Sequence, residues 1–166
     1  MPRHHDAPES SRRQERIAEL ITHTGIDEAL IERLVRRFYE HIQQDSVLGP
    51  IFAARIADWE PHLQRMFSFW SSVCLASGRY HGQPMQKHAS LPVDARHFDR
   101  WLALFASTAR EVCSDEVAEQ FIERARRIAT SLEMGRADAH GMLLSKGERF
   151  LDPSLSIPDS CPVDAG

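Results

Sequence analysis

Long apolar runs are missing from this chain of 166 residues. No stretch approaches the roughly 20 apolar residues that cross a bilayer, so we expect no membrane association. Residues 1–16 are polar and charged, which argues against a signal peptide. The formal charge of −4 argues against general binding to nucleic acid. We expect a cytoplasmic monomer whose single domain is large enough to bury a good core.

Cysteine is scarce, and Cys74, Cys113 and Cys161 lie far apart without a CxxC pair. An odd number of separated cysteines is typical of a reducing compartment. Cys74 and Cys113 fall on apolar positions of helical patterns, so we interpret them as core residues. The chain also has no Gly-rich phosphate loop, HExxH motif or nucleophile elbow, which excludes three common kinds of catalytic site.

Strand patterns are absent as well, and helical periodicity dominates the middle of the chain. Apolar residues recur at steps of three and four, and they predict four strong helices, at about 26–43, 59–76, 95–113 and 115–134. A weaker apolar stripe predicts a helix at 11–22. Residues suited to N-caps precede three of the strong helices, and glycines follow two of them: Asp58, Asp94 and Ser114, and Gly78 and Gly135. The fold class is therefore all-α.

The composition divides the chain into three parts. Residues 26–135 carry the strong helical patterns and form the expected domain. Residues 1–25 form an N-terminal extension with a short helical stretch. Residues 136–166 shift toward Gly, Pro, Ser and Asp, and we expect this C-terminal tail to be mobile.

The segment 80–88, YHGQPMQKH, lies between two of the predicted helices. Gly82 permits backbone angles that other residues avoid, and Pro84 can begin a helical turn. We expect a tight turn followed by one or two helical turns that stop before Pro92. Such a segment can hold the imidazole of His88 at a fixed angle to whatever the long helices enclose.

Polar aromatic side chains fall on apolar stripes or borders in four different segments: Tyr39, His62, His88 and Trp101. Taken singly, each is more simply a core or surface residue, since a buried Tyr or Trp usually satisfies its polar atom at the edge of a core. Taken together, they suit a haem pocket. One neutral imidazole can bind iron, and a Tyr hydroxyl or Trp indole N–H can donate to a bound diatomic ligand, each contributing about 1.5–3 kcal/mol.

Large apolar residues can wall such a flat cofactor, and the candidates are Phe52, Met66, Phe69, Phe98 and Phe105. Iron ligation by both His62 and His88 is an alternative when no external ligand is bound. A second alternative is an all-α interaction module without haem, in which the histidines are structural.

The combined motifs resemble the third group of truncated haemoglobins. The resemblance covers residues 26–134, and its matching stretches are FYE at 38–40, LGPIF at 48–52, WEPH at 59–62 with Phe69-Trp70, GQPMQKH at 82–88 with Leu91-Pro92, and HFDRWLALF at 97–105. It implies a two-over-two helical globin fold and haem b as cofactor. It also implies that His88 is the proximal iron ligand and that Tyr39 and Trp101 are distal hydrogen-bond donors.

By the same resemblance, His62 is a distal histidine that acts as a gate or a competing ligand. Arg65 matches a position that carries a basic residue near the haem propionates in relatives, although a solvated Arg explains it equally well. Met85 completes the expected cofactor contacts.

The implied function is reversible binding of dioxygen, nitric oxide, carbon monoxide or similar small ligands. Two donors near the iron should slow dioxygen release, which suits sensing, nitric oxide or dioxygen handling, or redox chemistry better than bulk transport. The alternative is a haem enzyme, a nitric oxide dioxygenase or a peroxidase-like protein, that uses the same site with a reductase partner. The sequence does not separate these functions.

Overall fold

The computed structural model describes residues 7–156, and the side chains of Ala7, Pro8 and Met85 are left out of the description. These residues form seven helices: α1 (Ala7–Thr24), α2 (Glu28–Gln44), α3 (Leu48–Arg55), α4 (Trp59–Leu75), α5 (Pro84–His88), α6 (Ala95–Val112) and α7 (Asp115–Ala139). No strand occurs between residues 7 and 156. The predicted all-α class is confirmed.

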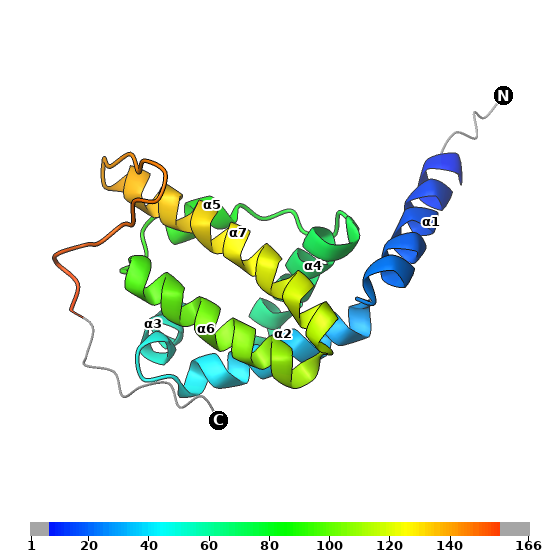
Figure 1. Ribbon diagram of the computed structural model, residues 1–166, viewed down its shortest axis with the longest axis horizontal. Helices are drawn as coiled ribbons and strands as arrows, with labels where there is room; N and C mark the ends of the chain where they lie inside the picture. The colour runs from blue at the N-terminus through cyan, green and yellow to red at the C-terminus, as the bar shows by residue number, and fades with distance from the viewer. Residues whose placement is uncertain (1–6, 157–166) are drawn as a thin grey trace.

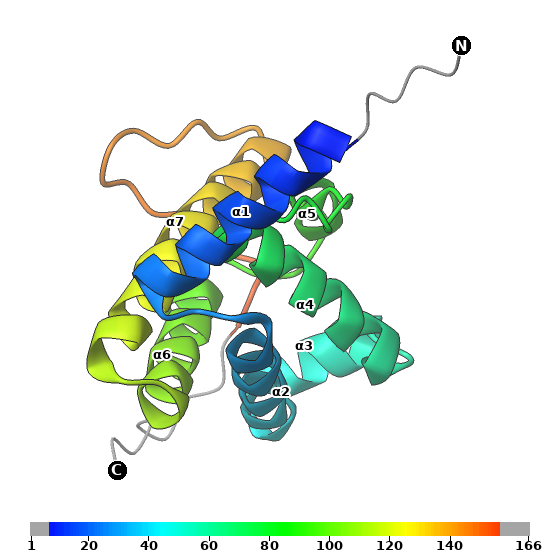
Figure 2. The same cartoon turned by 90° about the vertical axis from the view of Figure 1, so that its right-hand side faces the viewer.

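Two helix pairs form the body of the molecule. α2 packs on α4, α6 packs on α7, and contacts between α2 and α6 join the pairs (Figures 1 and 2). Each apolar stripe lies in the shared interior, where Ile31, Phe38, Phe105 and Phe121 are almost fully buried. Burial of such side chains stabilises the fold by roughly 1.5–3 kcal/mol each. The expected two-over-two arrangement is therefore present.

The connection between α2 and α3 is held by one carboxylate. Asp45 accepts hydrogen bonds from the backbone N–H groups of Val47 and Leu48 at 3.1 and 2.9 Å, so it caps the start of α3. Arg100 of α6 donates to both oxygens of the same carboxylate. Gly49 is required here because a Cβ would lie 2.9 Å from the carbonyl oxygen of Gln43. These contacts fix α3 against α2 and α6.

Three of the predicted helix features are wrong. α7 continues through Gly135 to Ala139, because a single helical glycine costs only about 1 kcal/mol and Arg136 and Ala137 are buried. α4 ends at Leu75 and Ala76 is its left-handed C-cap, with φ 51°; Gly78 also has a positive φ, 69°, but lies two residues beyond the cap. Gly82 does not have a positive φ. A Cβ there would overlap the hydroxyl end of Tyr80, a half-buried side chain that would have to move.

The two ends of the described chain behave differently. α1 contacts α4, and most of its surface is exposed (Figure 2). Its Ile17, Leu20 and Ile21 are partly buried against the main core. Residues 140–156 turn back beside the end of α7 (Figure 1), and Phe150 is 1 % exposed.

Cys74 is buried and Cys113 half-buried, both as free thiols, while Cys161 lies outside the described residues. None of the helices within residues 7–156 is long and apolar enough to cross a membrane.

Candidate functional site

A cavity of about 420 Å³ lies between α2, α3, α4, α5, α6 and α7. Its volume falls in the range of small-molecule and cofactor sites. The lining is mainly apolar, with Phe38, Leu48, Ile51, Phe52, Met66, Phe69, Leu91, Val93, Phe98, Ile128 and Leu132. The two helix pairs and the short α5 therefore enclose an apolar space that has polar groups at only a few points.

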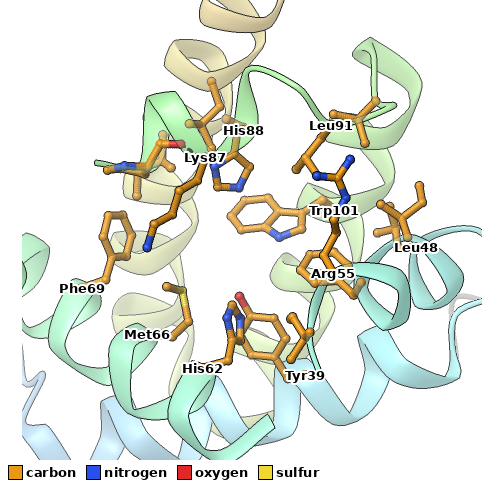
Figure 3. A pocket seen from close by; sticks show the side chains of 18 of the residues that line it. Tyr39, Leu48, Arg55, His62, Met66, Phe69, Lys87, His88, Leu91 and Trp101 are labelled. Carbon is orange, nitrogen blue, oxygen red and sulfur yellow. Dashed lines mark hydrogen bonds between the residues drawn. The ribbon is translucent and has the colours of Figure 1, made fainter. Parts of the chain in front are cut away.

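His88 enters this cavity from α5 (Figure 3). Its Nδ1 lies 2.6 Å from the carbonyl oxygen of Pro84, one turn earlier. Because a carbonyl only accepts, Nδ1 carries the proton and Nε2 keeps a free lone pair. Burial lowers the pKa of His88, although the bond to Pro84 partly opposes this effect. The side chain is thus held in the neutral tautomer that binds a metal through Nε2.

Tyr39 of α2 and His62 of α4 lie together on the opposite side of the cavity (Figure 3). Their rings make an edge-to-face contact with centroids 5.0 Å apart. Burial raises the pKa of Tyr39, so its hydroxyl remains protonated and able to donate. Among the described side chains the Tyr39 hydroxyl has no hydrogen-bond partner. The hydroxyl is therefore free to donate to a small molecule in the cavity.

His62 carries a buried polar atom without a partner on the same side of the cavity. Its Nε2 is buried and has no hydrogen-bond partner among the described residues. Burial, followed by the positive charges of Arg65, Lys87 and His88, lowers the pKa of His62 to about 4. The imidazole is therefore neutral at pH 7 and can accept or donate a hydrogen bond, or ligate a metal.

Trp101 of α6 lies between His88 and the Tyr39–His62 pair at the wall of the cavity (Figure 3). Its indole stacks on Phe105, with centroids 5.5 Å apart and an interplanar angle of 15°. Phe38 contacts it edge-on at 5.6 Å. Phe105 itself does not line the cavity, contrary to the prediction, but supports Trp101 from behind.

Three cationic side chains surround the cavity: Arg55, Arg65 and Lys87. All three residues are exposed, so the apolar space has a basic rim. Of these three cations, the sequence predicted only Arg65. Lys87 directly precedes His88, and Arg55 lies one turn beyond Ile51 and Phe52 on α3. These positions, next to predicted site residues, could have identified Lys87 and Arg55 from the sequence.

The structure brings together nine of the ten predicted cofactor contacts: Tyr39, Phe52, His62, Arg65, Met66, Phe69, His88, Phe98 and Trp101. The tenth, Met85, is a residue whose side chain is not described. Besides Arg55 and Lys87, two polar lining residues were missed, Tyr80 and His97. Tyr80 packs edge-on against Phe69, and His97 is buried with its Nδ1 accepting from the Asp94 N–H, so His97 serves the capping box of α6.

These residues fit haem. The cavity is apolar, as a porphyrin ring requires, and the basic rim suits the two carboxylate groups of haem. One imidazole with a free Nε2 faces it from α5, and the Tyr39 hydroxyl and the buried, unpartnered His62 Nε2 lie on the opposite side. A protein ligand for the iron and a distal pocket with hydrogen-bonding groups are the parts that a haem site of this kind needs. The fold and the cavity together define a globin.

Comparisons with known proteins agree. The sequence profile described as "Bacterial-like globin" matches residues 19–134. The group 3 truncated hemoglobin ctb of Campylobacter jejuni is 34% identical over 113 residues, which are 65% of this chain and 89% of that protein. The chain belongs to the bacterial-like globin family, within the third group of truncated haemoglobins.

Solved structures support the same conclusion. The crystal structure of the group III truncated hemoglobin from Campylobacter jejuni aligns with a TM-score of 0.62 and covers 65% of this chain and 89% of that chain at 34% identity. The hemoglobin of Chloroflexus aurantiacus is 23% identical with a TM-score of 0.56, over 70% of this chain and 96% of that chain, and shows the shared fold alone. The predicted family, and with it a haem-binding globin for small diatomic ligands, is confirmed.

Proposed function

We propose that the cavity binds haem b and that His88 Nε2 is the proximal iron ligand. The observation that carries this proposal is the 2.6 Å contact between His88 Nδ1 and the Pro84 carbonyl oxygen. A hydrogen bond of this kind fixes the tautomer and the direction of the ring, and it makes Nε2 a better ligand. Pro84 and His88 belong to the same short helix, so ligand and support are positioned together.

The residues on the far side of the cavity hold the bound small molecule in this proposal. Haem supplies an iron that binds dioxygen, nitric oxide or carbon monoxide. The Tyr39 hydroxyl and the Trp101 indole N–H donate to the ligand, and dioxygen gains most because it carries the most negative charge when bound. Each donor contributes about 1.5–3 kcal/mol in a desolvated site. His62 Nε2 competes for the same space when no ligand is present.

The basic rim anchors the cofactor in this proposal. Lys87, Arg65 and Arg55 neutralise the two haem carboxylates, and Lys87 does so from the same short helix as His88. Exposed ion pairs contribute about 0–1 kcal/mol each, so the rim orients haem more than it retains it. Retention comes from the apolar walls and from His88.

Two donors on one ligand favour slow dioxygen release. Slow release suits sensing, nitric oxide or dioxygen handling, or redox chemistry, and it does not suit bulk transport. Nitric oxide dioxygenation and peroxide turnover with a reductase partner stay alternatives for the same site. A cytoplasmic location and a monomeric state also stay predictions.

The test is replacement of His88 by Gly, with imidazole added back. His88→Gly should lose haem during purification or dialysis, and millimolar imidazole should restore retention because it can occupy the vacated position. His81→Ala is the matched control, since His81 is exposed on the same segment. Normal haem retention by His88→Gly without imidazole would exclude His88 as the proximal ligand.

A further inference from the structure

Arg136 is a buried arginine at the end of α7, far along the chain from the residues assigned above. It is 6 % exposed, and its Nε is buried without a hydrogen-bond partner in the described part of the chain. Burying a guanidinium is costly unless the group is paired and hydrogen-bonded. The groups that pair with the Arg136 guanidinium must therefore offset this cost, and they indicate its role.

The guanidinium reaches the segment that carries His88. Arg136 Nη1 donates to the carbonyl oxygen of Ala89 at 2.9 Å, and Ala89 directly follows His88. The backbone of α5 packs along α7, so this bond ties the end of the short helix to the long one (Figure 1). The His88 ring is held by Pro84 on one side, and the chain after His88 is held by Arg136 on the other.

The C-terminal segment 140–156 provides the remaining contacts of the Arg136 guanidinium. The ring of Phe150 lies 5.7 Å from the guanidinium carbon, and Asp152 Oδ2 lies 3.8 Å from Nη2. His140 Nδ1 accepts from Nη1 at 2.8 Å. A cation–π contact and a nearby carboxylate stabilise a desolvated guanidinium. The matched globin region ends at residue 134, so these partners lie beyond it.

The segment is itself fixed to the body of the molecule. The Phe150 carbonyl oxygen accepts from the Ala95 N–H at 2.7 Å, and the Asp152 N–H donates to the buried Asp94 at 3.1 Å. Arg149 bonds Glu133 and Asp99, which joins the segment to α7 and α6. The segment therefore spans the beginning of α6 and the end of α7 and encloses Arg136.

We infer that Arg136 is a positioning residue for His88, and that residues 140–156 hold Arg136 in place for this purpose. The inference rests on the proposed role of His88. A single turn of helix cannot fix a ligand by its own hydrogen bonds, because isolated short helices are unstable. The bond from Arg136 to Ala89 supplies an external constraint on that turn, and Phe150 and Asp152 fix the donor.

The experiment compares Arg136→Met, Arg136→Lys and Asp152→Asn as full-length haem-loaded proteins. Three quantities are measured: the rate of haem transfer to excess apomyoglobin, the iron–histidine stretching band in the ferrous resonance Raman spectrum, and hydrogen exchange of residues 84–91. Arg127→Met is the matched control, because Arg127 is exposed on the same helix and pairs only with Glu123 among the described residues.

Arg136→Met should release haem about tenfold faster, because one charge-assisted hydrogen bond to the ligand segment is lost. It should also shift the iron–histidine band and speed exchange in residues 84–91. Arg136→Lys should recover part of each effect, and Asp152→Asn should move all three measurements in the same direction by a smaller amount. Arg127→Met should match the wild type.

An unchanged band and an unchanged haem-transfer rate in Arg136→Met would overturn the inference, even if that variant unfolds at a lower temperature. If Arg136→Met does not fold, wild-type values in both Arg136→Lys and Asp152→Asn would overturn it. His88→Gly separates the two proposals. If it loses haem while the Arg136 variants behave normally, only the positioning role fails; if it keeps haem, the proximal role of His88 fails.

Discussion

Replacement of Tyr39 by Phe removes one hydroxyl and leaves the ring. The ring is held by edge contacts to Phe38, Phe52 and His62, with centroids 5.1, 5.9 and 5.0 Å away, and Phe preserves all three. The hydroxyl has no partner among the described side chains, so its loss breaks no internal hydrogen bond. The free energy of unfolding should therefore change little, and the effect should fall on the bound ligand.

The expected magnitude follows from one donor in a desolvated site. A hydrogen bond to a ligand that carries partial negative charge contributes about 1.5–3 kcal/mol, and each 1.4 kcal/mol corresponds to about a tenfold change in rate. Tyr39→Phe should therefore release dioxygen about 10- to 100-fold faster than the wild type. Stopped-flow mixing of the dioxygen complex with excess carbon monoxide measures this rate directly.

Two controls accompany this measurement. The chain has only one other tyrosine, Tyr80, which also lines the cavity but packs against Phe69 before α5 and is not a proposed donor, so Tyr80→Phe should change dioxygen release far less than Tyr39→Phe. Carbon monoxide carries little charge when bound, so its dissociation from Tyr39→Phe should change far less than that of dioxygen. A dioxygen release rate within twofold of the wild type would refute the assignment of Tyr39 as a donor.

Three further predictions concern other side chains. Trp101→Phe should also speed dioxygen release about tenfold, and a wild-type rate in stopped-flow measurements would remove the indole as a donor. The ferric protein without added ligand should be low-spin and become high-spin in His62→Ala, because His62 Nε2 is unpaired at the cavity; identical absorption spectra would exclude His62 as a ligand. Burial alone would raise the pKa of Asp45, but bonds from Arg100 and two backbone N–H groups hold it below its ordinary value. Asp45→Asn should therefore cost about 2 kcal/mol of unfolding free energy at pH 7. This cost should begin to shrink as the pH falls below about 4, where the carboxyl of the unfolded chain binds a proton, and should vanish only at the lower pH where the folded carboxylate is protonated. Urea unfolding that shows the same difference at pH 7 and in acid would contradict this account.

The long helices were predictable because each carries a continuous apolar stripe. The observed starts of α2, α4, α6 and α7 lie within two residues of the predicted ones. Asp58, Asp94 and Ser114 occupy the predicted N-cap positions, but of these three only Asp94 makes a side-chain capping hydrogen bond. Helix ends were harder to predict. Gly135 lies in a helix whose final turns are stabilised by burial of Ala137 and by the contacts of Arg136 with Ala89 and Phe150, which are distant in sequence from Arg136 or lie outside the helix.

The candidate site was predictable in its aromatic and histidine members, because those types are unusual on an apolar stripe and matched a family pattern. Arg55 and Lys87 were not found, since an exposed basic residue is ordinary anywhere on a surface. The Phe150 contacts were not found either. A lone apolar residue in a polar segment has no periodicity, and only the folded position of α6 and α7 creates the place where it is buried.

The absorption spectrum of the purified protein tests the central claim most directly. Ferric, ferrous and carbon monoxide forms are recorded on the wild-type chain after haem is supplied at equal concentration. A bound haem with one protein ligand and an accessible second side predicts a strong Soret band that shifts when the iron is reduced and again when carbon monoxide is added. A protein that binds haem at one equivalent should give all three spectra. No Soret band beyond that of free haem, or no response to carbon monoxide, would contradict the account.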